Sequence, residues 1–367
     1  MIPLATIVFC LLVWTSGAVA ETAAPGSALR AETQSATLPH VHLVATGGTI
    51  SNRDGGRLTA EELAKSMPGV EKQVRLTYEQ FSNVASSQLT LEQWLSLSRR
   101  VNELFAKDSG LAGLVITSGT DTLEETAFFL HLTVKDTRPV VVVGSMRNPS
   151  TLGYEGAANL LEAVRVAATP AAKDKGVLVV LNDEINSARD VTKTDALRLQ
   201  TFQSREYGQL GIVDRDRVVF FRQILQRHTS RSEFDVTGMK ELPRVDVILT
   251  YQGAPADLIK AAVDAGAKGV VIAGAGAGAM SGTQSEGVDY AAQKGVFVVI
   301  GTRTGSGRIA PPSPPSPNAK PTPAQQRRRE FSISADDHPP LKARILLMLA
   351  LTKTNDRSNI QRMFGEY

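Results

Sequence analysis

The chain has almost no cysteine, few aromatic side chains and no large excess of charge of either sign. Its 367 residues contain one cysteine, Cys10, and 5% Phe, Trp and Tyr. A single thiol excludes a disulfide framework within the chain and a zinc site built from several cysteines. Because 40 basic and 37 acidic residues are interspersed, the formal charge of +3 does not indicate a nucleic-acid-binding protein. The length and the 42% hydrophobic content predict a soluble protein of two domains.

Long apolar segments are also rare, and the one at the N-terminus is typical of an export signal. Residues 2–14 are mostly apolar, and the small-x-small pattern Ala18-Val19-Ala20 follows them. The run is short for a membrane span, so we predict a signal peptide at residues 1–20 and a periplasmic or secreted protein. No Lys or Arg precedes the apolar run, which leaves a membrane anchor as the alternative.

After residue 40, apolar strands alternate with amphipathic helices, which predicts an α/β fold. Seven short β-branched runs are almost continuously apolar, as in strands buried on both faces of a parallel sheet. They are Val41–Ala45, Leu111–Thr117, Pro139–Gly144, Val177–Leu181, Val245–Thr250, Lys268–Ala273 and Val296–Ile300. Capping boxes predict helix starts at three threonines, namely Thr59 with Glu62, Thr90 with Gln93, and Thr122 with Glu125.

The pattern divides the chain into two domains of unequal size. We predict a larger N-terminal catalytic domain over residues 40–222, with a mostly parallel sheet, and a linker over 223–243. A smaller, flavodoxin-like α/β domain is predicted over 244–367. The run from 311 to 330 holds seven prolines, and we expect it to be an extended loop with its three arginines, 327–329, in solvent.

Two glycine-rich segments follow predicted strands, and neither matches a nucleotide-binding loop. Thr46-Gly47-Gly48-Thr49 lacks the lysine that follows the last glycine of a phosphate loop. The segment AGAGAGAM, at 273–280, spaces its glycines like a dinucleotide fingerprint, but no Asp or Glu stands about twenty residues later to bind a ribose. We attribute the glycines of the second segment to close packing of a helix on the sheet.

The histidines do not predict a metal centre. Of the five, only His40 and His42 are spaced so that both side chains point to one face, and no second cluster accompanies them. We interpret both as residues at the start of a strand and expect no metal or other cofactor. A histidine stays open as a general base, although nothing in the sequence places one beside a nucleophile.

Hydroxyl, carboxylate and amine groups follow the predicted strands at their carboxyl ends, where open α/β sheets place their sites. Thr49 follows the first strand, Thr120 and Asp121 the second, Ser145 the third and Lys193 the fourth. A threonine hydroxyl needs an adjacent base, and a partly desolvated lysine oriented by an aspartate can supply one. Each residue alone has a structural explanation as a turn, a cap or a surface cation. Together, at four strand ends, they favour a nucleophilic site.

These residues lie in two motifs, ATGGTI at 45–50 and VITSGTDTLEETAFFLHLTVK at 115–135, that closely resemble the signatures of bacterial type II L-asparaginases. The segments VVVVGSMR, GVLVVLNDEINSARDVTKT, HTSRSEFDV and LKARILLMLALT are similar to the same family. The resemblance covers residues 41–367 apart from the proline-rich run. It implies hydrolysis of L-asparagine to L-aspartate and ammonia through an acyl-threonine intermediate, without a cofactor. It also implies a homotetramer, built as a dimer of dimers.

The resemblance implies a role for each matching residue. Thr49 is the implied primary nucleophile, and Thr120, Asp121 and Lys193 match the family's second threonine, aspartate and lysine. Ser86 matches the serine that binds the α-carboxylate of the substrate, and Asp121 also meets its α-ammonium group. The other implied substrate-binding positions are Gly48, Ser87, Gly119 and Ser145.

Several positions depart from the family's pattern. Leu58 stands where the family usually has a tyrosine on a mobile loop, and the loop 51–57 is short. Ser87 replaces a Gln or Glu, Ser118 replaces a histidine, and Gly253 stands where some members place an asparagine from the adjacent subunit. The preference between asparagine and glutamine therefore stays open, with a mixed glutaminase-asparaginase as the alternative.

Two functions of other kinds stay open as well. An amidase for a transfer-RNA-borne or peptide substrate would need a cytosolic protein with an RNA-binding face, which the apolar N-terminus and the balanced charge disfavour. An exported amino-acid-binding relative with weakened catalysis would bind aspartate or asparagine and release no ammonia.

Overall fold

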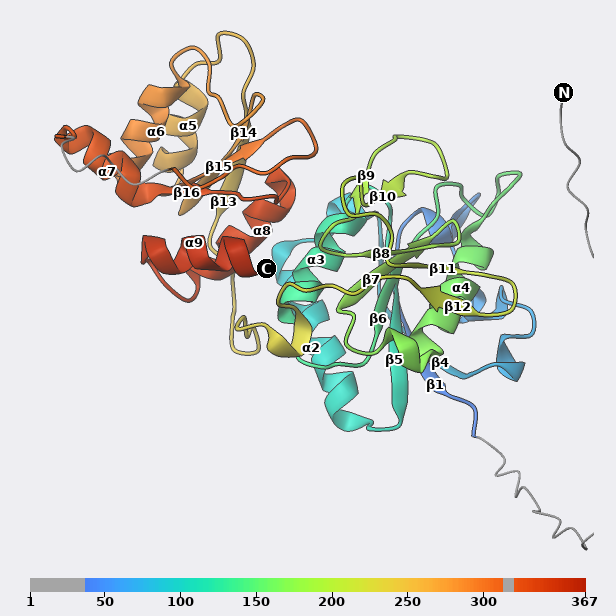
Figure 1. The fold of residues 1–367 in the computed structure, drawn as a ribbon. Helices are drawn as coiled ribbons and strands as arrows, with labels where there is room; N and C mark the ends of the chain where they lie inside the picture. The colour runs from blue at the N-terminus through green and yellow to red at the C-terminus, as the bar shows by residue number, and fades with distance from the viewer. Residues whose placement is uncertain (1–36, 313–319) are drawn as a thin grey trace, which may run out of the picture. The chain divides into compact units, whose positions relative to one another are not determined.

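The computed structural model describes residues 37–312 and 320–367 (Figure 1). The predicted signal peptide lies outside the described residues, as does part of the proline-rich run. An eight-stranded sheet belongs to the N-terminal part of the chain and a four-stranded sheet to the C-terminal part. The predicted fold class, a larger α/β domain followed by a smaller one, is confirmed. No helix among the described residues has the length and apolar character that crossing a membrane requires.

The larger sheet is parallel over its central strands and antiparallel at one side. In spatial order its strands are β12 (Val218–Phe220), β11 (Gly211–Val213), β8 (Glu184–Ser187), β7 (Val177–Leu181), β6 (Val140–Val143), β5 (Leu111–Thr117), β1 (His40–Gly47) and β4 (Arg75–Val84). The five strands from β7 to β4 run parallel, and the other three add antiparallel pairs. The carboxyl ends of β1, β5 and β6 therefore lie at one edge of the sheet.

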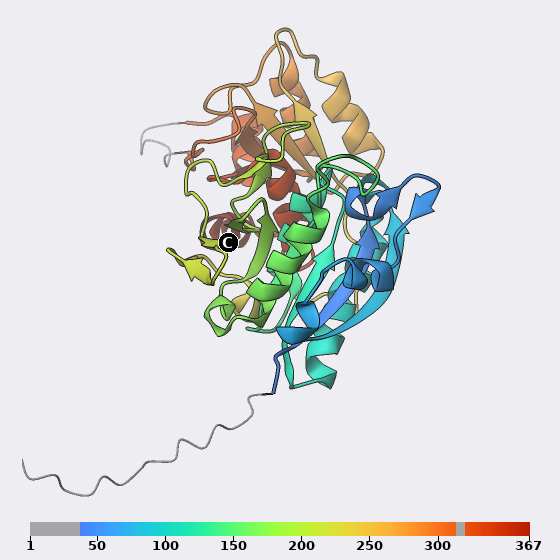
Figure 2. The ribbon, with the colours of Figure 1, turned by 90° about the vertical axis from the view of Figure 1, so that its right-hand side faces the viewer.

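Helices cover both faces of this sheet, which explains why its strands are apolar at nearly every position. The helices are α1 (Ala60–Lys65), α2 (Leu91–Lys107), α3 (Leu123–Thr133) and α4 (Gly156–Ala168). Val115 packs in one cluster with α1 and α4, whereas its neighbours Leu114 and Ile116 pack in another with α2 and α3. In Figure 2 the green helix α4 lies across the sheet.

The edge strand β4 is not predicted from the sequence, because one side of an edge strand faces solvent and its residues are largely polar. β4 pairs with β1 in parallel register, from His40 opposite Arg75 to Ala45 opposite Gln80. Both β1 histidines contact its Thr77 hydroxyl, at 2.9 Å from His40 Nε2 and 2.7 Å from His42 Nδ1. These contacts agree with the interpretation of both histidines as strand residues on one face.

The smaller sheet has four parallel strands, β13 (Val245–Leu249), β14 (Gly269–Gly274), β15 (Phe297–Thr302) and β16 (Ser332–Ser334). Its helices are α5 (Asp257–Asp264), α6 (Gln284–Gln293), α8 (Pro340–Leu351) and α9 (Arg357–Glu366). α5 and α6 pack with one face of the sheet, and α8 and α9 with the other. The second cluster also holds Phe128 and Phe129 of α3, so one apolar core joins residues of both domains.

Part of the proline-rich run forms a helix, which corrects the expectation of an extended, solvated loop. Helix α7 (Pro323–Phe331) begins with a capping box between Thr322 and Gln325, with a proline in its first turn. A proline fits there because the first helical N–H groups have no acceptor within the helix. Arg328 of α7 pairs with Asp289 at 2.5 Å, and the Arg327 guanidinium lies 4.2 Å from the centre of the Phe331 ring.

The second glycine-rich segment folds back on itself, so its attribution to helix packing is wrong. Ala275 and Ala279 exchange two backbone hydrogen bonds of 2.8 Å. A Cβ on Gly274 would lie 2.7 Å from the Gly278 backbone. These glycines therefore permit a tight loop after β14.

Candidate active site

The ends of β1 and β5 meet through glycine backbone. A Cβ on Gly48 would lie 2.1 Å from the backbone nitrogen of Gly119, closer than any side chain can approach. Gly48 also has a φ of +89°, in the region that disfavours other residues. Before it, the Thr46 hydroxyl donates to the carbonyl of Thr117 at 2.6 Å, which ties the two strands together. Thr49 follows at once and begins a short 3-10 turn.

Ser86 completes this contact from the end of β4. Its side chain is buried, and a Cβ on Gly119 would lie 2.8 Å from its hydroxyl oxygen. The same oxygen accepts a hydrogen bond of 3.3 Å from the backbone N–H of Thr122, at the start of α3. The predicted capping box at Thr122 is wrong, since its side chain makes no capping bond, whereas those at Thr59 and Thr90 are confirmed.

Lys193 joins the predicted threonine and aspartate of the second motif. It lies on β9 (Thr192–Lys193), which pairs with β10 (Phe202–Gln203). Its Nζ lies 3.0 Å from the Thr120 hydroxyl oxygen and 3.0 Å from Asp121 Oδ1. The Lys193 side chain is 16% exposed, while that of Asp121 is 71% exposed. An amine held between a hydroxyl and a carboxylate can move a proton to or from that hydroxyl.

Two residues that the sequence analysis did not identify hold the backbone that carries Lys193. Glu124 of α3, almost buried, accepts hydrogen bonds from the Thr192 hydroxyl at 3.1 Å and from the Lys193 N–H at 3.3 Å. Lys342 of α8, fully buried, donates to the carbonyls of Arg189 and Val191. Burial lowers the pKa of Lys342 to about 8. In the sequence, Glu124 is indistinguishable from the other acids of a helix first turn.

A small cavity of about 70 Å³ gathers five of the predicted residues. Those that line it are Gly48, Thr49, Ser86, Gly119 and Asp121, together with Asn52, Arg57 and Ala85. Thr120 and Lys193 do not line the cavity. Lys193 is hydrogen-bonded to Asp121, which does line it, and Thr120 is hydrogen-bonded to Lys193. Within the described residues, no side-chain hydrogen bond is made by the Thr49 hydroxyl. The cavity therefore presents that hydroxyl beside an exposed carboxylate.

Two of the predicted substrate-binding residues do not reach this cavity. The buried hydroxyl of Ser145 donates to the carbonyl of Arg147 at 2.6 Å and is occupied there. Ser87 is exposed on the turn beside Ser86 and does not line the cavity. Of the two neighbouring serines, only Ser86 is positioned to meet a bound molecule.

The loop after Thr49 is a short hairpin held at its base. β2 (Asn52–Arg53) pairs with β3 (Gly56–Arg57), and the Leu58 N–H donates to the carbonyl of Ser51 at 2.6 Å. Leu58 precedes the capping residue Thr59, and Leu63 follows four residues after it, which is the spacing of a hydrophobic staple. Leu58 packs against the core cluster that contains Leu63, as this spacing predicts. Tyr154, which the sequence analysis did not identify, donates to the carbonyl of Ile50 at 2.9 Å and supports the turn that carries Thr49. Burial raises the pKa of Tyr154.

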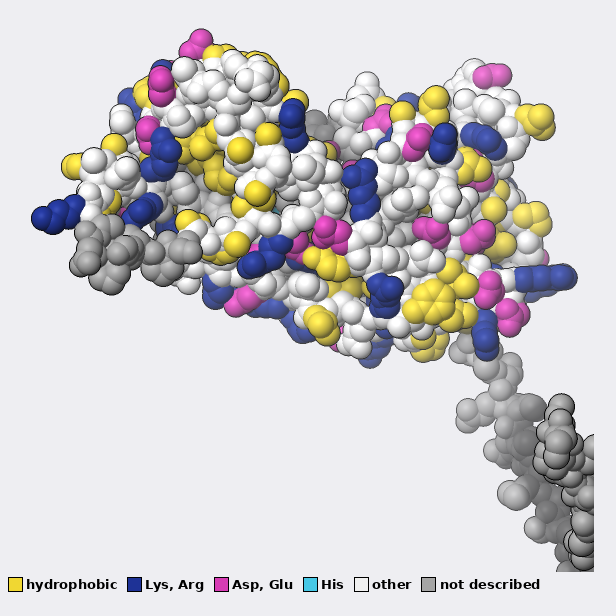
Figure 3. Space-filling model, turned by 45° about the horizontal axis from the view of Figure 1, so that its top comes forward, with side chains coloured by type: hydrophobic (Ala, Val, Ile, Leu, Met, Phe, Trp, Pro, Cys, Tyr) yellow, Lys and Arg dark blue, Asp and Glu magenta, His cyan; other side chains and the backbone are white. Residues whose placement is uncertain are grey.

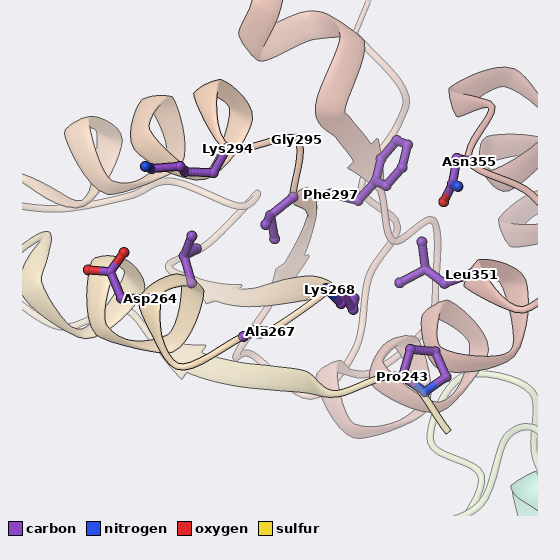
Figure 4. A pocket seen from close by; sticks show the side chains of 12 residues that line it. Pro243, Asp264, Ala267, Lys268, Lys294, Gly295, Phe297, Leu351 and Asn355 are labelled. Atoms are coloured by element: carbon purple, nitrogen blue, oxygen red, sulfur yellow. The ribbon is translucent and has the colours of Figure 1, made fainter. Parts of the chain in front are cut away.

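Other candidate sites are weaker. Within residues 37–312 and 320–367, no three or more His, Cys, Asp or Glu are grouped so that they could hold a metal ion. A larger cavity, about 560 Å³, lies at the amino ends of β14 and β15, among Asp264, Lys268 and Lys294 (Figure 4). It contains none of the residues that the sequence singled out, and it lies at the end of the sheet opposite to the one where α/β sites form.

Comparison with known proteins gives the family. Residues 40–226 match the model "Asparaginase, N-terminal", and residues 244–364 match the "Glutaminase/Asparaginase C-terminal domain". L-asparaginase 2 of Bacillus subtilis is 44% identical over 90% of this chain and 87% of that protein. A probable periplasmic L-asparaginase of Haemophilus influenzae is 36% identical over 90% of this chain and 94% of its own length.

A solved structure agrees with these matches. The probable cytoplasmic L-asparaginase of Campylobacter jejuni has a crystal structure that resembles this one with a TM-score of 0.82. The two sequences are 37% identical, and the match covers 90% of this chain and 100% of that chain. With both domains matched and relatives of this identity covered almost throughout, the chain belongs to the asparaginase family.

Proposed function

We propose that this chain hydrolyses the side-chain amide of L-asparagine to L-aspartate and ammonia. The chain is an amidohydrolase of the asparaginase family. The observation that carries the proposal is the bonding of Lys193 to both Thr120 and Asp121 beside a cavity lined by Thr49. This is the hydroxyl, base and carboxylate arrangement that acyl transfer requires.

In the proposed reaction the Thr49 hydroxyl attacks the amide carbon. A bond forms between Thr49 Oγ1 and that carbon as the Thr49 proton passes through Thr120 to Lys193. The same proton then returns by way of Thr120 to the amide nitrogen, the carbon–nitrogen bond breaks, and ammonia leaves. Water then attacks the acyl-threonine, releasing aspartate and restoring the hydroxyl. Asp121, whose Oδ1 lies 3.0 Å from Lys193 Nζ, holds that amine beside the Thr120 hydroxyl. Gly48, at the turn, supplies backbone that can approach the developing oxyanion.

The substrate is proposed to bind by its amino-acid end. Asp121 lines the cavity with an exposed carboxylate, which suits the α-ammonium group. The Ser86 hydroxyl, fixed by the bond from Thr122, suits the α-carboxylate. Holding the two charged groups places the side-chain amide toward Thr49, and such positioning accounts for a large part of the rate in acyl transfer.

Two variants and a control test this function. Ammonia release from L-asparagine is measured for the unaltered protein and for Thr49→Ala, Thr120→Val and Ser145→Ala. The first two changes should each lower kcat by on the order of a thousandfold or more, as expected when a member of a cooperating catalytic set is lost. Ser145→Ala removes a hydroxyl that is already bonded elsewhere and should leave kcat within about twofold. Full activity in both threonine variants would contradict the assignment of Thr49 as nucleophile and of Thr120 as the group that passes its proton on.

The preference for asparagine over glutamine is a finer proposal. One extra methylene is worth only about 1–3 kcal/mol in a pocket, so a mixed glutaminase-asparaginase is the alternative. The C-terminal family model carries both activities in its description. The ratio of kcat/KM for the two substrates separates the possibilities, and saturable aspartate binding without ammonia release would indicate the non-catalytic binder. On the face in Figure 3, basic and acidic side chains are interspersed, which does not favour an RNA substrate.

We further infer that the protein is exported and acts as a homotetramer. The apolar N-terminus supports export, while the names of the relatives point to both the periplasm and the cytoplasm. Fractionation of cells that express the full chain, with the N-terminus of the purified protein determined, tests the first inference. Sedimentation at several concentrations tests the second, and a monomer at all of them would contradict it.

A further inference from the structure

One cation lines the small cavity, and the proposed reaction leaves it without a role. Arg57, at the end of the hairpin after Thr49, lines the cavity together with Thr49, Ser86 and Asp121. It is the only lysine or arginine among the described residues that do so. Its Nη1 lies 3.4 Å from the carbonyl oxygen of Gly48, a long hydrogen bond that anchors the guanidinium beside the turn.

No carboxylate in the part of the chain that the structure describes pairs with Arg57. Within the described residues, Arg57 forms no ion pair, whereas Arg53 of the same hairpin pairs with Glu62 at 2.9 Å. Arg53 does not line the cavity. A guanidinium carries five donors, so the single bond to Gly48 leaves most of them available. An unpaired arginine at a cavity wall is suited to an anionic group of a ligand.

The cavity wall is electrostatically complementary to a zwitterion. Asp121 supplies a negative charge and Arg57 a positive one, and the Ser86 hydroxyl adds a neutral donor. Without Arg57, the side chains that line the cavity would offer the carboxylate of an amino acid only neutral donors, such as the Ser86 hydroxyl. Asp121 in the same small site repels a carboxylate, so a cation at the cavity wall favours binding of the free amino acid.

We propose that Arg57 is a specificity-determining residue that binds the α-carboxylate of the substrate together with Ser86. This inference rests on the proposed function, because it concerns the amino-acid end of the same substrate. In this role Arg57 acts on substrate binding and on the choice of free amino acids over amides that lack this carboxylate. Because a guanidinium binds a carboxylate through two parallel hydrogen bonds, lysine should replace it only in part.

The experiment uses two substrates and three variants. L-Asparagine is compared with L-aspartic acid diamide, in which a neutral amide replaces the α-carboxylate, and hydrolysis of the side-chain amide is followed by chromatography of the product. The variants are Arg57→Met, Arg57→Lys and the matched control Arg53→Met. Unchanged thermal midpoints establish that each variant is folded, as expected for side chains on a solvent-facing hairpin.

Arg57→Met should lower kcat/KM for asparagine about 10- to 100-fold, mostly through KM, which corresponds to losing a hydrogen-bonded charge pair. The same change should leave the diamide within about twofold. Arg57→Lys should recover part of the loss, and Arg53→Met should match the unaltered protein on both substrates. An equal loss on both substrates, or no loss on either, overturns the proposal.

Failure of the proposed function can be told apart from failure of this inference. If the unaltered protein releases no ammonia from either amide, binding of L-aspartate is measured by calorimetry instead. Affinity at least tenfold weaker in Arg57→Met than in Arg53→Met then supports the carboxylate contact without catalysis. Equal affinity in the two variants, or no aspartate binding by the unaltered protein, overturns it.

Discussion

Two glycine-rich loops follow parallel strands in this protein, one at 46–49 after β1 and one at 273–280 after β14. In the first, the absent side chains let two strands touch, since a Cβ on Gly48 would strike Gly119 of the neighbouring strand end. In the second, they let one loop fold onto itself, since a Cβ on Gly274 would strike Gly278. The first arrangement joins distant parts of the sequence, and the second joins only near neighbours.

The threonine hydroxyls at the two sheet ends also differ in their hydrogen-bond partners. Beside the first loop, the Thr120 hydroxyl is bonded to an amine, Lys193 Nζ. At the end of β15 in the second sheet, the hydroxyl of Thr302 is bonded to that of Thr304 at 3.0 Å. Two neutral hydroxyls cannot activate one another at neutral pH, whereas an amine can accept a proton. Glycine content and hydroxyls alone therefore do not mark a site.

The largest expected difference comes from removing the amine. Lys193→Met should lower kcat on asparagine by on the order of a thousandfold, within the range for loss of a general base. Thr302→Val, at the other sheet end, should leave kcat within about twofold. Initial rates of ammonia release at saturating substrate provide the measurement. Similar losses in the two variants would contradict the distinction between the two sheet ends.

Adding one carbon to each glycine loop should have the next largest effect. Gly48→Ala must displace the Gly119 backbone and with it the turn of Thr49, so we expect at least a hundredfold loss of kcat. At Gly276, an added Cβ meets nothing within 4 Å, although φ is +49°. Gly276→Ala should cost about 1–2 kcal/mol of unfolding free energy and spare activity. Unfolding followed by circular dichroism measures the stability of each variant, and initial rates of ammonia release measure its kcat.

Acid unfolding tests the contribution of the buried histidine pair His131 and His228 to stability. Burial lowers the pKa of His228 to about 4, with the charge of Arg231 contributing, and its ring lies 5.2 Å from that of His131. Between about pH 4 and 6.5 the unfolded chain binds a proton at His228 that the folded protein does not, so stability falls as the pH falls. From pH 6.5 to 5 this amounts to about 1.5 kcal/mol.

His228→Gln keeps an acceptor for Arg231 and should reduce the loss of stability between pH 6.5 and 5 by about 1.5 kcal/mol. Urea unfolding at the two pH values measures it. If the pH dependence of unfolding is the same with glutamine, His228 is not one of the groups that cause it.

A smaller effect is expected from the residues that orient groups at each sheet end. Glu124 accepts bonds from Thr192 and Lys193, and Gln284 in the second sheet accepts bonds from Thr250 and Ser281. Glu124→Leu should lower kcat about tenfold by loosening the lysine, with KM little changed. Gln284→Leu should lower only the thermal midpoint. If the two variants lowered kcat equally, both residues would act on the stability of the fold and not on the position of Lys193.

The smallest effect is expected at Leu58, where the family usually has a tyrosine. Tyr154 already donates a hydrogen bond to the turn that carries Thr49, so Leu58→Tyr should leave kcat unchanged or raise it a few-fold. Leu58 also packs against the core, and a severe loss of kcat or of folding would mean that its packing matters more than the loop. Steady-state kinetics and a thermal midpoint distinguish these outcomes.

The sequence by itself determined the capped starts of α1 and α2 and seven strands, namely β1, β5, β6 and β7 of the larger sheet and β13, β14 and β15 of the smaller one. Those features depend on local causes, namely β-branched apolar runs and a threonine followed by an acid or amide three residues on. It also singled out Thr49, Thr120, Asp121 and Lys193, because they follow predicted strands at the sheet edge where α/β sites form and lie in segments that resemble those of asparaginases. It could not identify β4 or α7, whose compositions resemble those of polar loops.

Only the tertiary structure decided which of these residues meet. Lys193 and Thr120 are 73 positions apart in the chain, and their 3.0 Å contact depends on β9, on Glu124 and on the buried Lys342. The structure also distinguishes Ser86, which lines the cavity, from Ser87 and Ser145, which do not. Sequence patterns act over a few residues, whereas the position of a side chain in the site depends on packing between elements that the chain brings together only on folding.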